Sequence, residues 1–322
     1  MLMLGLQGSP RLKGNTNYLL SAFMEEARKF GVQTHVIQVC KKNIEPCKEY
    51  IVCEKKGFCP IDDDMKHEIY SLLREAEFVI AATPVFFYNT TAQLKALIDR
   101  SQTLWARRYK LKLVDPGSKT RRGVLLSVGA TKGKNLFEGL HLTAKYFFDA
   151  INASYEGGLT YRQIEQPGDM EKHPGVDADI KNTVASLVKP LLGRPRVLVL
   201  GRENACRSQM ASAFLQYQAG DKIEVLCAGT EPGEKIHPVM EKVMQEKGID
   251  MAFRRPKGIQ EVSTAEPPAL IIDLDEKTGS DIYPGVERQV WHIPSALESS
   301  VEAMAEIRDK IEKKVGDIIQ KF

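Results

Sequence analysis

The chain lacks an apolar run of the length, about 20 residues, that a helix needs to cross a bilayer. It also lacks a charge surplus, since 45 Lys and Arg stand against 42 Asp and Glu, which gives a formal net charge of +3. That balance argues against general nucleic-acid binding. The opening MLMLGLQGSPR has no basic start and breaks at Gly8 and Pro10, unlike a secretion signal. These features predict a cytoplasmic protein with neither membrane nor nucleic acid as partner.

Cysteine is scarce, and its placement is uneven. Four of the six cysteines fall between Cys40 and Cys59. A secreted domain held by disulfides would spread them more widely. Crowding of this kind in a cytosolic protein indicates metal or redox chemistry, and ordinary reduced thiols are the alternative.

One pattern occurs twice in the 322 residues: an apolar strand, a loop of small residues and a helix. The first copy is MLMLGL, then QGSPRLKGNT, then a helix from about Asn17. The second is RVLVL, then GRENACRS, then a helix from about Gln209. A parallel strand buried on both faces reads as a continuous apolar run. The N–H groups of such a loop and the dipole of the next helix together attract an anion.

Strands and helices alternate through both halves, which predicts an α/β fold with two doubly wound parallel-sheet domains. We expect a first domain at 1–192, a linker at 193–196 (GRPR) and a second domain at 197–322. In the first domain, the expected strands are 34–39, 78–84, 122–129 and 153–156, and the expected helices are 62–76, 90–104, 136–148 and 177–192. In the second, strands are expected at 222–230, 269–275 and 288–294, and helices at 237–247 and 301–318.

Three segments of the first half carry a family resemblance. GSPRLKGNTNYLL, TPVFFYNTTAQLKALIDR and the cysteine-rich stretch ending in GFCPIDDDM resemble the NADPH-dependent FMN reductases and the iron–sulfur flavoproteins. The likeness covers most of the first 160 residues. It implies a flavodoxin-like domain that binds FMN, uses NAD(P)H as a co-substrate and transfers electrons through the flavin. The flavin performs such chemistry, so no side chain is predicted to be catalytic.

The residue types fit FMN independently of the resemblance. The hydroxyls of Ser9 and Thr16, the amides around Gly14 and the cation of Arg11 suit a phosphate at a helix N-terminus. Doubly wound folds bind ligands at the carboxyl ends of their strands, where the flavin ring would lie. The predicted cofactor-binding residues are Ser9, Arg11, Gly14, Asn15, Thr16, Asn17, Pro84, Val85, Phe86, Phe87, Tyr88, Asn89 and Gly129. A packing cluster is the alternative for the three aromatic residues.

The cysteine cluster departs from the iron–sulfur flavoprotein pattern. Cys47, Cys53 and Cys59 match three of the four ligand positions, and Tyr50 occupies the second. Each iron of a [4Fe–4S] cluster normally takes its own thiolate. The resemblance therefore implies a metal site with an incomplete ligand set, and we favour the alternative of free thiols left as a remnant.

From Arg196 onward, NACRSQMASAF and AGTEPGEKIHP resemble the low-molecular-weight protein tyrosine phosphatases and the arsenate reductases built on them. That family uses a Cys, five residues and an Arg, with a distant Asp-Pro that supplies the acid. Here Arg207 is present, but Gly201 stands at the nucleophile position and Ser295-Ala296 at the Asp-Pro position. Phosphatase activity is therefore predicted to be absent.

The loop can still bind an oxyanion, because its amides and Arg207 do not depend on the lost thiol. The predicted anion-binding residues are Gly201, Arg202, Glu203, Asn204, Ala205, Cys206, Arg207 and Ser208. A purely structural appendage is the alternative for the domain, and a salt-bridged loop residue is the alternative for Arg207.

The function these patterns predict is an FMN-dependent oxidoreductase, with a small-molecule or protein electron donor and acceptor, fused to an oxyanion-binding or regulatory module. The resemblance implies a dimer through the flavodoxin-like domain. The basic stretch 107–122 is predicted to be a solvated loop, with docking of an acidic carrier or of the NADPH 2′-phosphate as the alternative. The second hypothesis for the whole chain is a non-enzymatic flavin and anion sensor or scaffold.

Overall fold

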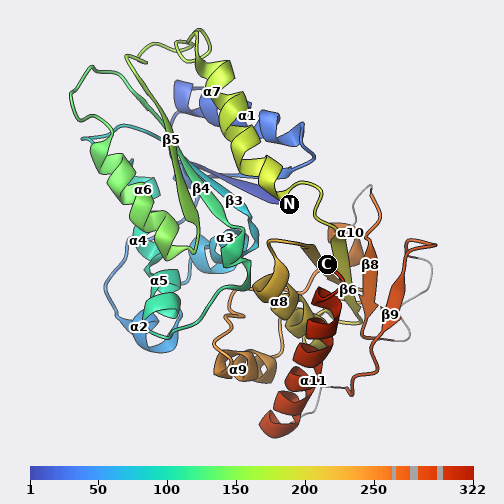
Figure 1. The fold of residues 1–322 in the computed structure, drawn as a ribbon. Helices are drawn as coiled ribbons and strands as arrows, with labels where there is room; N and C mark the ends of the chain where they lie inside the picture. The colour runs from blue at the N-terminus through green and yellow to red at the C-terminus, as the bar shows by residue number, and fades with distance from the viewer. Residues whose placement is uncertain (263–265, 276–281, 296–299) are drawn as a thin grey trace. The chain divides into compact units, whose positions relative to one another are not determined.

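The computed structural model describes residues 1–262, 266–275, 282–295 and 300–322. The chain divides into two compact units (Figure 1). The first unit comprises Met1–Lys112 and Thr120–Leu192, and the second comprises Leu113–Lys119 and Gly193–Phe322.

The first unit is built on a parallel sheet of five strands in the order β2-β1-β3-β4-β5. The strands are β1 (Leu2–Gln7), β2 (Gln33–Gln38), β3 (Phe78–Pro84), β4 (Arg122–Gly129) and β5 (Ser154–Arg162). This is the strand order of flavodoxin-like folds, which confirms the predicted class. The order reverses beside β1, so the carboxyl ends of β1 and β3 flank the place where such folds bind ligands.

Helices cover both faces of this sheet (Figure 1). On one face α1 (Asn15–Arg28) and α7 (Val176–Val188) pack on Met3, Phe78 and Val124 of the strands. The remaining helices are α2 (Val52–Lys56), α3 (Tyr70–Glu75), α4 (Ala92–Arg100), α5 (Gln102–Tyr109) and α6 (Glu138–Ala150). Short turns are η1 (Val39–Lys41), the π-helical η2 (Met65–Ile69) and η4 (Lys189–Leu191).

Two expected helices of this unit are interrupted. The helix expected at 90–104 is divided into α4 and α5 at Ser101, whose hydroxyl donates to the carbonyl of Leu97 at 3.0 Å. A serine that bonds back to position i−4 bends a helix. The helix expected at 62–76 begins instead with the π-helical turn η2. The strand expected at 153–156 continues to Arg162.

The second unit has a four-stranded parallel sheet among its described residues, in the order β7-β6-β8-β9. The strands are β6 (Arg196–Gly201), β7 (Glu224–Gly229), β8 (Leu270–Asp273) and β9 (Arg288–Val290). The helices are α8 (Arg207–Ala219), α9 (Pro238–Glu246), α10 (Ile259–Val262) and α11 (Val301–Ile319). The helices α8, α9 and α11 bury the main core on one face of this sheet.

A short segment from the first half of the sequence belongs to the second unit. Val114 donates its backbone N–H to Gly248 at 2.7 Å and accepts from Asp250 at 2.8 Å, and η3 (Pro116–Lys119) packs on α8. The chain therefore passes between the units at three points, after Lys112, Lys119 and Leu192.

Among the described residues, no helix combines the length and the apolar character that crossing a membrane requires.

Candidate flavin and anion sites

The loop after β1 is held close to the next strand. Gly8 donates its N–H to the carbonyl of Ala82 at 2.8 Å, and a Cβ at Gly8 would lie 3.0 Å from that carbonyl oxygen. Only glycine allows this approach without a shift of the backbone. Further along, the Ser9 hydroxyl accepts the N–H of Arg11 at 3.2 Å, which turns the chain toward α1.

The N-terminus of α1 has no cap from the protein. Its N-cap residue is Gly14, and the N–H groups of Asn15, Thr16 and Asn17 donate to no described residue. Thr16 is 2% exposed, and its hydroxyl has no hydrogen-bond partner in the described chain. Uncapped N–H groups and the helix dipole together favour an anion at this end of α1.

The residues predicted to bind the FMN phosphate in the loop after β1 divide into those that hold the loop in place and those whose polar groups remain available. Asn15 donates to the carbonyl of Gln166 at 2.9 Å and accepts the N–H of Met170 at 3.2 Å, while Asn17 accepts from the Gln7 amide at 3.0 Å. These two side chains fix the loop. Arg11 is exposed. Ser9, Thr16, Arg11 and the free N–H groups thus remain as the groups available to a phosphate.

The loop after β3 is a tight turn with two aromatic residues at its tip. Phe86 and Asn89 exchange both backbone hydrogen bonds, at 2.8 and 2.9 Å, and Phe87 and Tyr88 between them have φ of +46° and +60°. Left-handed backbone at a bulky residue costs roughly 1 kcal/mol. Phe87 is fully exposed, and Phe86 and Tyr88 are about half exposed. The packing-cluster alternative is therefore wrong within this chain, and the strained turn leaves aromatic side chains exposed.

Neighbouring segments fit closely around this turn. A Cβ at Gly139 would lie 2.5 Å from the carbonyl oxygen of Tyr88, and a Cβ at Gly133 would lie 2.8 Å from its hydroxyl. Thr143 of α6 donates to the Asn89 side chain at 3.2 Å. Gly129, at the end of β4, leaves room for the Leu136 side chain, because a Cβ at Gly129 would lie 2.6 Å from the Leu136 Cδ2. The predicted residues after β3 and Gly129 therefore share one region of the unit.

The cysteine loop does not present a complete cluster site. Burial raises the pKa of Cys53, and the thiols of Cys59 and Cys47 raise it further. Tyr50 is more than half exposed. In the described chain no three Cys, His, Asp or Glu side chains are arranged to hold a metal ion. The residues present therefore do not fit a four-thiolate cluster.

The basic stretch 107–122 is not uniformly solvated. Arg107 is buried and donates to the Gly57 carbonyl at 2.9 Å, and Arg121 is buried and donates to the carbonyls of Arg74 and Ala76 at 2.6 and 2.9 Å. The prediction of a solvated loop is wrong for these two arginines. Main-chain carbonyls give a buried guanidinium the partners that it needs.

The carbonyl groups of the loop between β6 and α8 accept hydrogen bonds from the segment that follows β7. The N–H groups of Thr230, Glu231, Gly233 and His237 donate to the carbonyls of Gly201, Arg202, Glu203 and Ala205 at 2.8–3.3 Å. The N–H groups of residues 202–208 donate to no atom of the described chain. Unpaired N–H groups that lead into a helix start favour the binding of an anion.

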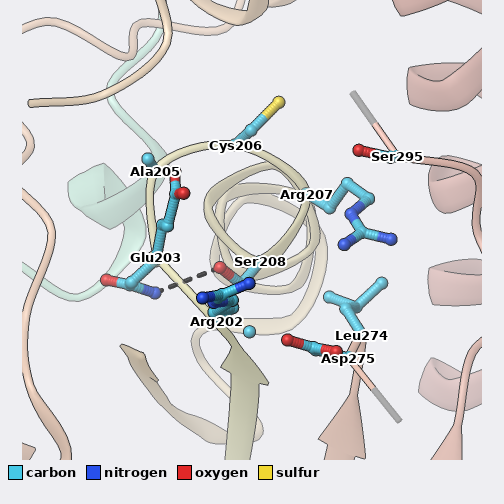
Figure 2. Close-up of a pocket in the computed structure, with 11 residues that line it drawn as sticks. Arg202, Glu203, Ala205, Cys206, Arg207, Ser208, Leu274, Asp275 and Ser295 are labelled. Carbon is cyan, nitrogen blue, oxygen red and sulfur yellow. Dashed lines mark hydrogen bonds between the residues drawn. The ribbon is translucent and has the colours of Figure 1, made fainter. Parts of the chain in front are cut away.

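A pocket of about 230 Å³ lies over this loop (Figure 2). It is lined by Gly201, Arg202, Glu203, Asn204, Ala205, Cys206, Arg207, Ser208, Leu274, Asp275 and Ser295. All eight predicted anion-binding residues therefore line one cavity. Ala296, the second residue of the predicted Asp-Pro replacement, lies outside the described residues.

Two buried polar residues support the loop from behind. Asn204, with φ of +51°, donates to the Ser208 hydroxyl at 3.1 Å and accepts from Gln209 and from the N–H of Lys257, both at 3.0 Å. Asn204 and Ser208 are almost completely buried. Such a satisfied network holds the loop in one conformation in the absence of a ligand.

Cys206 does not replace the missing nucleophile. It is 8% exposed, its Sγ lies 3.6 Å from the sulfur of Met304, and burial raises its pKa to about 12. Its side chain points away from the rest of the lining in Figure 2. Its thiol is therefore neutral and belongs to the core.

Arg207 is held by a main-chain group. Its guanidinium donates to the carbonyl of Ile293 at 2.5 Å and makes no ion pair with the described residues. In Figure 2 it extends toward Ser295 and Leu274. The salt-bridge alternative thus finds no partner within the described chain, and the remaining N–H groups of Arg207 are available at the pocket.

Sequence reasoning missed the role of Gly229. A Cβ at this residue would lie 2.5 Å from the carbonyl oxygen of Arg202 and 2.9 Å from the N of Asn204. Gly229 therefore allows the close approach that aligns the loop carbonyls with the 230–237 segment. The sequence did contain a signal, the AGT at residues 228–230 that ends the expected strand. We used it only as part of the family resemblance and gave no physical reason for its glycine.

Fold and sites together define a flavodoxin-like redox unit joined to a unit of the phosphatase class. Residues 1–135 match the family model of the NADPH-dependent FMN reductases, and residues 196–322 match that of the low molecular weight phosphotyrosine protein phosphatases. An iron-sulfur flavoprotein of Methanosarcina thermophila is 32% identical over 52% of this chain and 85% of its own length. The chain therefore belongs to the iron–sulfur flavoprotein family through its first unit. This membership supports an oxidoreductase.

The second unit has relatives of its own. A putative arsenate reductase of Halobacterium salinarum is 32% identical over 37% of this chain and 87% of its own length. A solved arsenate reductase in a phosphate binding state is 25% identical, covers 39% of this chain and 98% of that chain, and has a TM-score of 0.36. The family model and the Halobacterium salinarum relative show that the chain belongs, through its second unit, to the family that includes the phosphatases and these reductases.

Proposed function

We propose that the chain is an FMN-dependent oxidoreductase that passes electrons from NAD(P)H, or from a carrier protein, to an acceptor. The observation that carries the proposal is the uncapped start of α1, with the free N–H groups of Asn15, Thr16 and Asn17 beside the buried Thr16 hydroxyl. A phosphate dianion would satisfy these donors, and the family membership names FMN as the ligand of this type.

The chain's own residues would bind and orient the cofactor. The loop from Ser9 to Asn17 would hold the phosphate, and the exposed turn at Phe86–Asn89 would border the ring. Bound flavin supplies the hydride and electron chemistry, so the protein contributes position, polarity and exclusion of water.

A flavin titration tests the binding step. Full-length protein is titrated with FMN and followed by the quenching of flavin fluorescence. Thr16→Ala and Ser9→Ala each remove one contact to a charged group, worth about 1.5–3 kcal/mol, so each should weaken FMN binding by roughly tenfold or more. Thr34→Ala is the matched control, because Thr34 lies near the amino end of β2, where it pairs with Met3, and its hydroxyl accepts from Arg28. Equal affinity of all four proteins, or no binding by the wild type, contradicts the proposal.

A turnover assay distinguishes the oxidoreductase hypothesis from the hypothesis of a non-enzymatic sensor or scaffold. The FMN-loaded protein is mixed anaerobically with NADPH or NADH, and bleaching of the flavin followed by multiple turnovers with an added acceptor supports the oxidoreductase. Tight flavin binding without bleaching by either nucleotide would support the sensor or scaffold instead. Light scattering tests the dimer that we also propose for the first unit.

For the second unit we propose a module that binds an oxyanion without turning it over. The proposal is supported by the N–H groups of residues 202–208, which have no partner in the described chain, by the guanidinium of Arg207 and by the absence of a thiol at Gly201. Full-length protein should leave p-nitrophenyl phosphate intact. Hydrolysis that Arg207→Ala abolishes would contradict the loss of phosphatase activity.

A further inference from the structure

The two regions of the first unit that are proposed to hold FMN are joined through Gly8. Its N–H donates to the carbonyl of Ala82 in β3 at 2.8 Å, and its carbonyl accepts from the hydroxyl of Thr91 at 2.7 Å. Thr91 stands between the turn at Phe86–Asn89, called the aromatic turn below, and the start of α4. Gly8 directly precedes the loop from Ser9 to Asn17. One side chain therefore bonds the base of that loop to the segment that ends the aromatic turn.

Thr91 holds this bond in one geometry. Its side chain is completely buried, its N–H donates to the Thr83 hydroxyl at 3.3 Å, and its hydroxyl also accepts the N–H of Leu94 at 3.4 Å. A hydroxyl that donates to one partner and accepts from another has little freedom to rotate. Because the site is buried, water does not replace the donor when this hydroxyl is removed, and the Gly8 carbonyl loses a bond.

The Gly8 carbonyl has a second, weaker donor. The Sγ of Cys40, in the η1 turn that follows β2, donates to the same oxygen at 3.4 Å. Burial raises the pKa of Cys40, so the thiol keeps its proton at neutral pH. A thiol is a weak donor, and a carbonyl oxygen can accept two bonds at once. The segments that follow β1, β2 and β3 thus meet at one oxygen, with Thr91 as the stronger donor.

Each of the two regions is also closed by hydrogen bonds of its own. The side chains of Gln7 and Asn17 link the ends of the loop after β1 at 3.0 Å, and Phe86 and Asn89 close the aromatic turn. Loss of the Thr91 hydroxyl therefore leaves each region with these contacts and loosens the position of one region relative to the other. A ligand that spans both regions depends on that relative position, because it must reach both at the same time.

We propose that Thr91 is a positioning residue: through the Gly8 carbonyl it fixes the loop from Ser9 to Asn17 relative to the aromatic turn, so that the site prefers FMN over flavins without a phosphate. The inference rests on the proposed FMN site and adds the residue that makes its two regions act together. A ligand that contacts the aromatic turn alone gains nothing from this bond, whereas FMN gains from a site that is already arranged for both of its ends.

Fluorescence titration of the full-length chain with FMN and with lumiflavin, which has the ring without the phosphate tail, tests the inference. Thr91→Val keeps the shape of the side chain but removes the hydroxyl. It should weaken FMN binding by about tenfold, while lumiflavin binding changes by less than about twofold. Thr91→Ser restores the hydroxyl and should bind both ligands as the wild type does. Thr90→Val is the matched control, because the Thr90 hydroxyl donates to the carbonyl of Thr91 at 3.1 Å and makes no bond to Gly8. It should keep the wild-type affinity for both ligands.

A double variant tests whether the effect passes through the Gly8 carbonyl. Cys40→Ala removes the weaker donor and should weaken FMN binding by less than about threefold. Combined with Thr91→Val, it leaves the buried carbonyl without either donor, so the loss of FMN affinity should exceed the product of the two single losses. A loss equal to that product would show that the two side chains do not act through one oxygen, and would overturn the route proposed for Thr91.

The outcomes separate the inference from the proposed function beneath it. If Thr91→Val binds FMN as the wild type does while Thr16→Ala does not, Thr91 does not position the site and the FMN proposal stands. If Thr91→Val weakens FMN and lumiflavin equally, or if Thr91→Ser fails to restore FMN binding, the hydroxyl does not hold the two regions together and the inference is wrong. If the wild type binds no FMN, the proposed function and the inference both fall.

Thermal unfolding checks the fold of Thr91→Val, because this variant also loses the bond that caps α4. Thr91→Ala removes the hydroxyl without placing a methyl group against the Gly8 carbonyl, and it is measured in the same way. It should show the same selective loss of FMN affinity. Wild-type FMN affinity in a folded Thr91→Ala would overturn the inference by itself.

Discussion

Arg100 and Asp63 form a buried two-point ion pair that fixes the cysteine loop to α4. The guanidinium nitrogens lie 2.5 and 3.1 Å from the two carboxylate oxygens, and both side chains are at most 1% exposed. Asp63 also accepts the N–H of Glu45 at 3.0 Å, and Arg100 donates to the carbonyl of Glu45 at 2.8 Å. The pair therefore closes the segment that contains Cys47, Cys53 and Cys59.

Asp63→Asn should destabilise the first unit by about 3 kcal/mol, because it leaves a buried guanidinium without its counter-charge. Urea unfolding monitored by circular dichroism measures the loss. Lys95→Ala is the control on the same helix: it breaks the exposed pair with Asp99 and should change the unfolding free energy by less than about 1 kcal/mol. Equal losses of unfolding free energy in the two variants would show that removing the counter-charge of buried Arg100 destabilises the protein no more than breaking an exposed ion pair does.

Two substitutions at Phe87 distinguish the cost of its left-handed backbone from a role of its ring in FMN binding. Phe87→Gly removes left-handed strain from a fully exposed residue and should stabilise the free protein by roughly 1 kcal/mol. Phe87→Ala keeps the strain and should leave stability nearly unchanged. Both remove the ring, so both should weaken FMN binding to a similar extent if the turn borders the flavin. Unchanged FMN affinity in both variants would assign the turn to a partner surface.

The sequence predicted the frame of both units because strands buried on two faces are continuous apolar runs. MLMLGL, FVIAATP and RVLVL became β1, β3 and β6 within one or two residues. Boundaries that depend on one side chain were missed, as at Ser101, where a hydroxyl bond to Leu97 divides a helix. The insertion of residues 113–119 into the second unit depends on backbone pairing with Gly248 and Asp250, which composition does not reveal.

The candidate sites were predictable where a residue type carries the chemistry. The eight residues of the second-unit loop were identified from the resemblance to the phosphatases and from the place of Arg207 in that family's motif, and they do line one pocket. The charged stretch 107–122 was misjudged because charge alone does not show that main-chain carbonyls surround Arg107 and Arg121. Gly229 was missed since its role is a close approach of two backbones that are distant in sequence.

Tyr50→Cys should restore the ligand set that the cysteine loop lacks. Each iron of a [4Fe–4S] cluster takes one thiolate, and Tyr50 stands at the one position of the four that lacks a thiol. After anaerobic incubation with iron and sulfide, the variant should hold about four irons per chain, and the wild type should hold clearly fewer. Iron analysis and visible absorption measure this, with Tyr50→Ser as the control that removes the ring without adding a thiol. A full cluster in the wild type would reinstate the metal site at Cys47, Cys53 and Cys59.

Cys206 should react slowly with iodoacetamide and should make the second unit less stable at high pH. Burial is the main cause of its pKa of about 12 against an ordinary 9.0, so near neutral pH its thiolate fraction is about 1000-fold lower than that of an unperturbed cysteine. The exposed Cys47 serves as the internal control in peptide mapping of the labelled protein. Labelling of Cys206 as fast as Cys47 under native conditions would contradict its burial.

The sign of the pH effect follows from the same shift. A raised pKa in the folded state means that the folded protein holds the thiol proton more tightly than the unfolded chain does. The contribution of Cys206 to stability is therefore complete below pH 9.0 and is lost as the pH rises toward 12. Cys206→Ala should unfold with a shallower loss of free energy over that range, because its side chain has no proton to lose. Parallel stability curves for the two proteins between about pH 8 and pH 11 would show that Cys206 ionises no differently in the folded state.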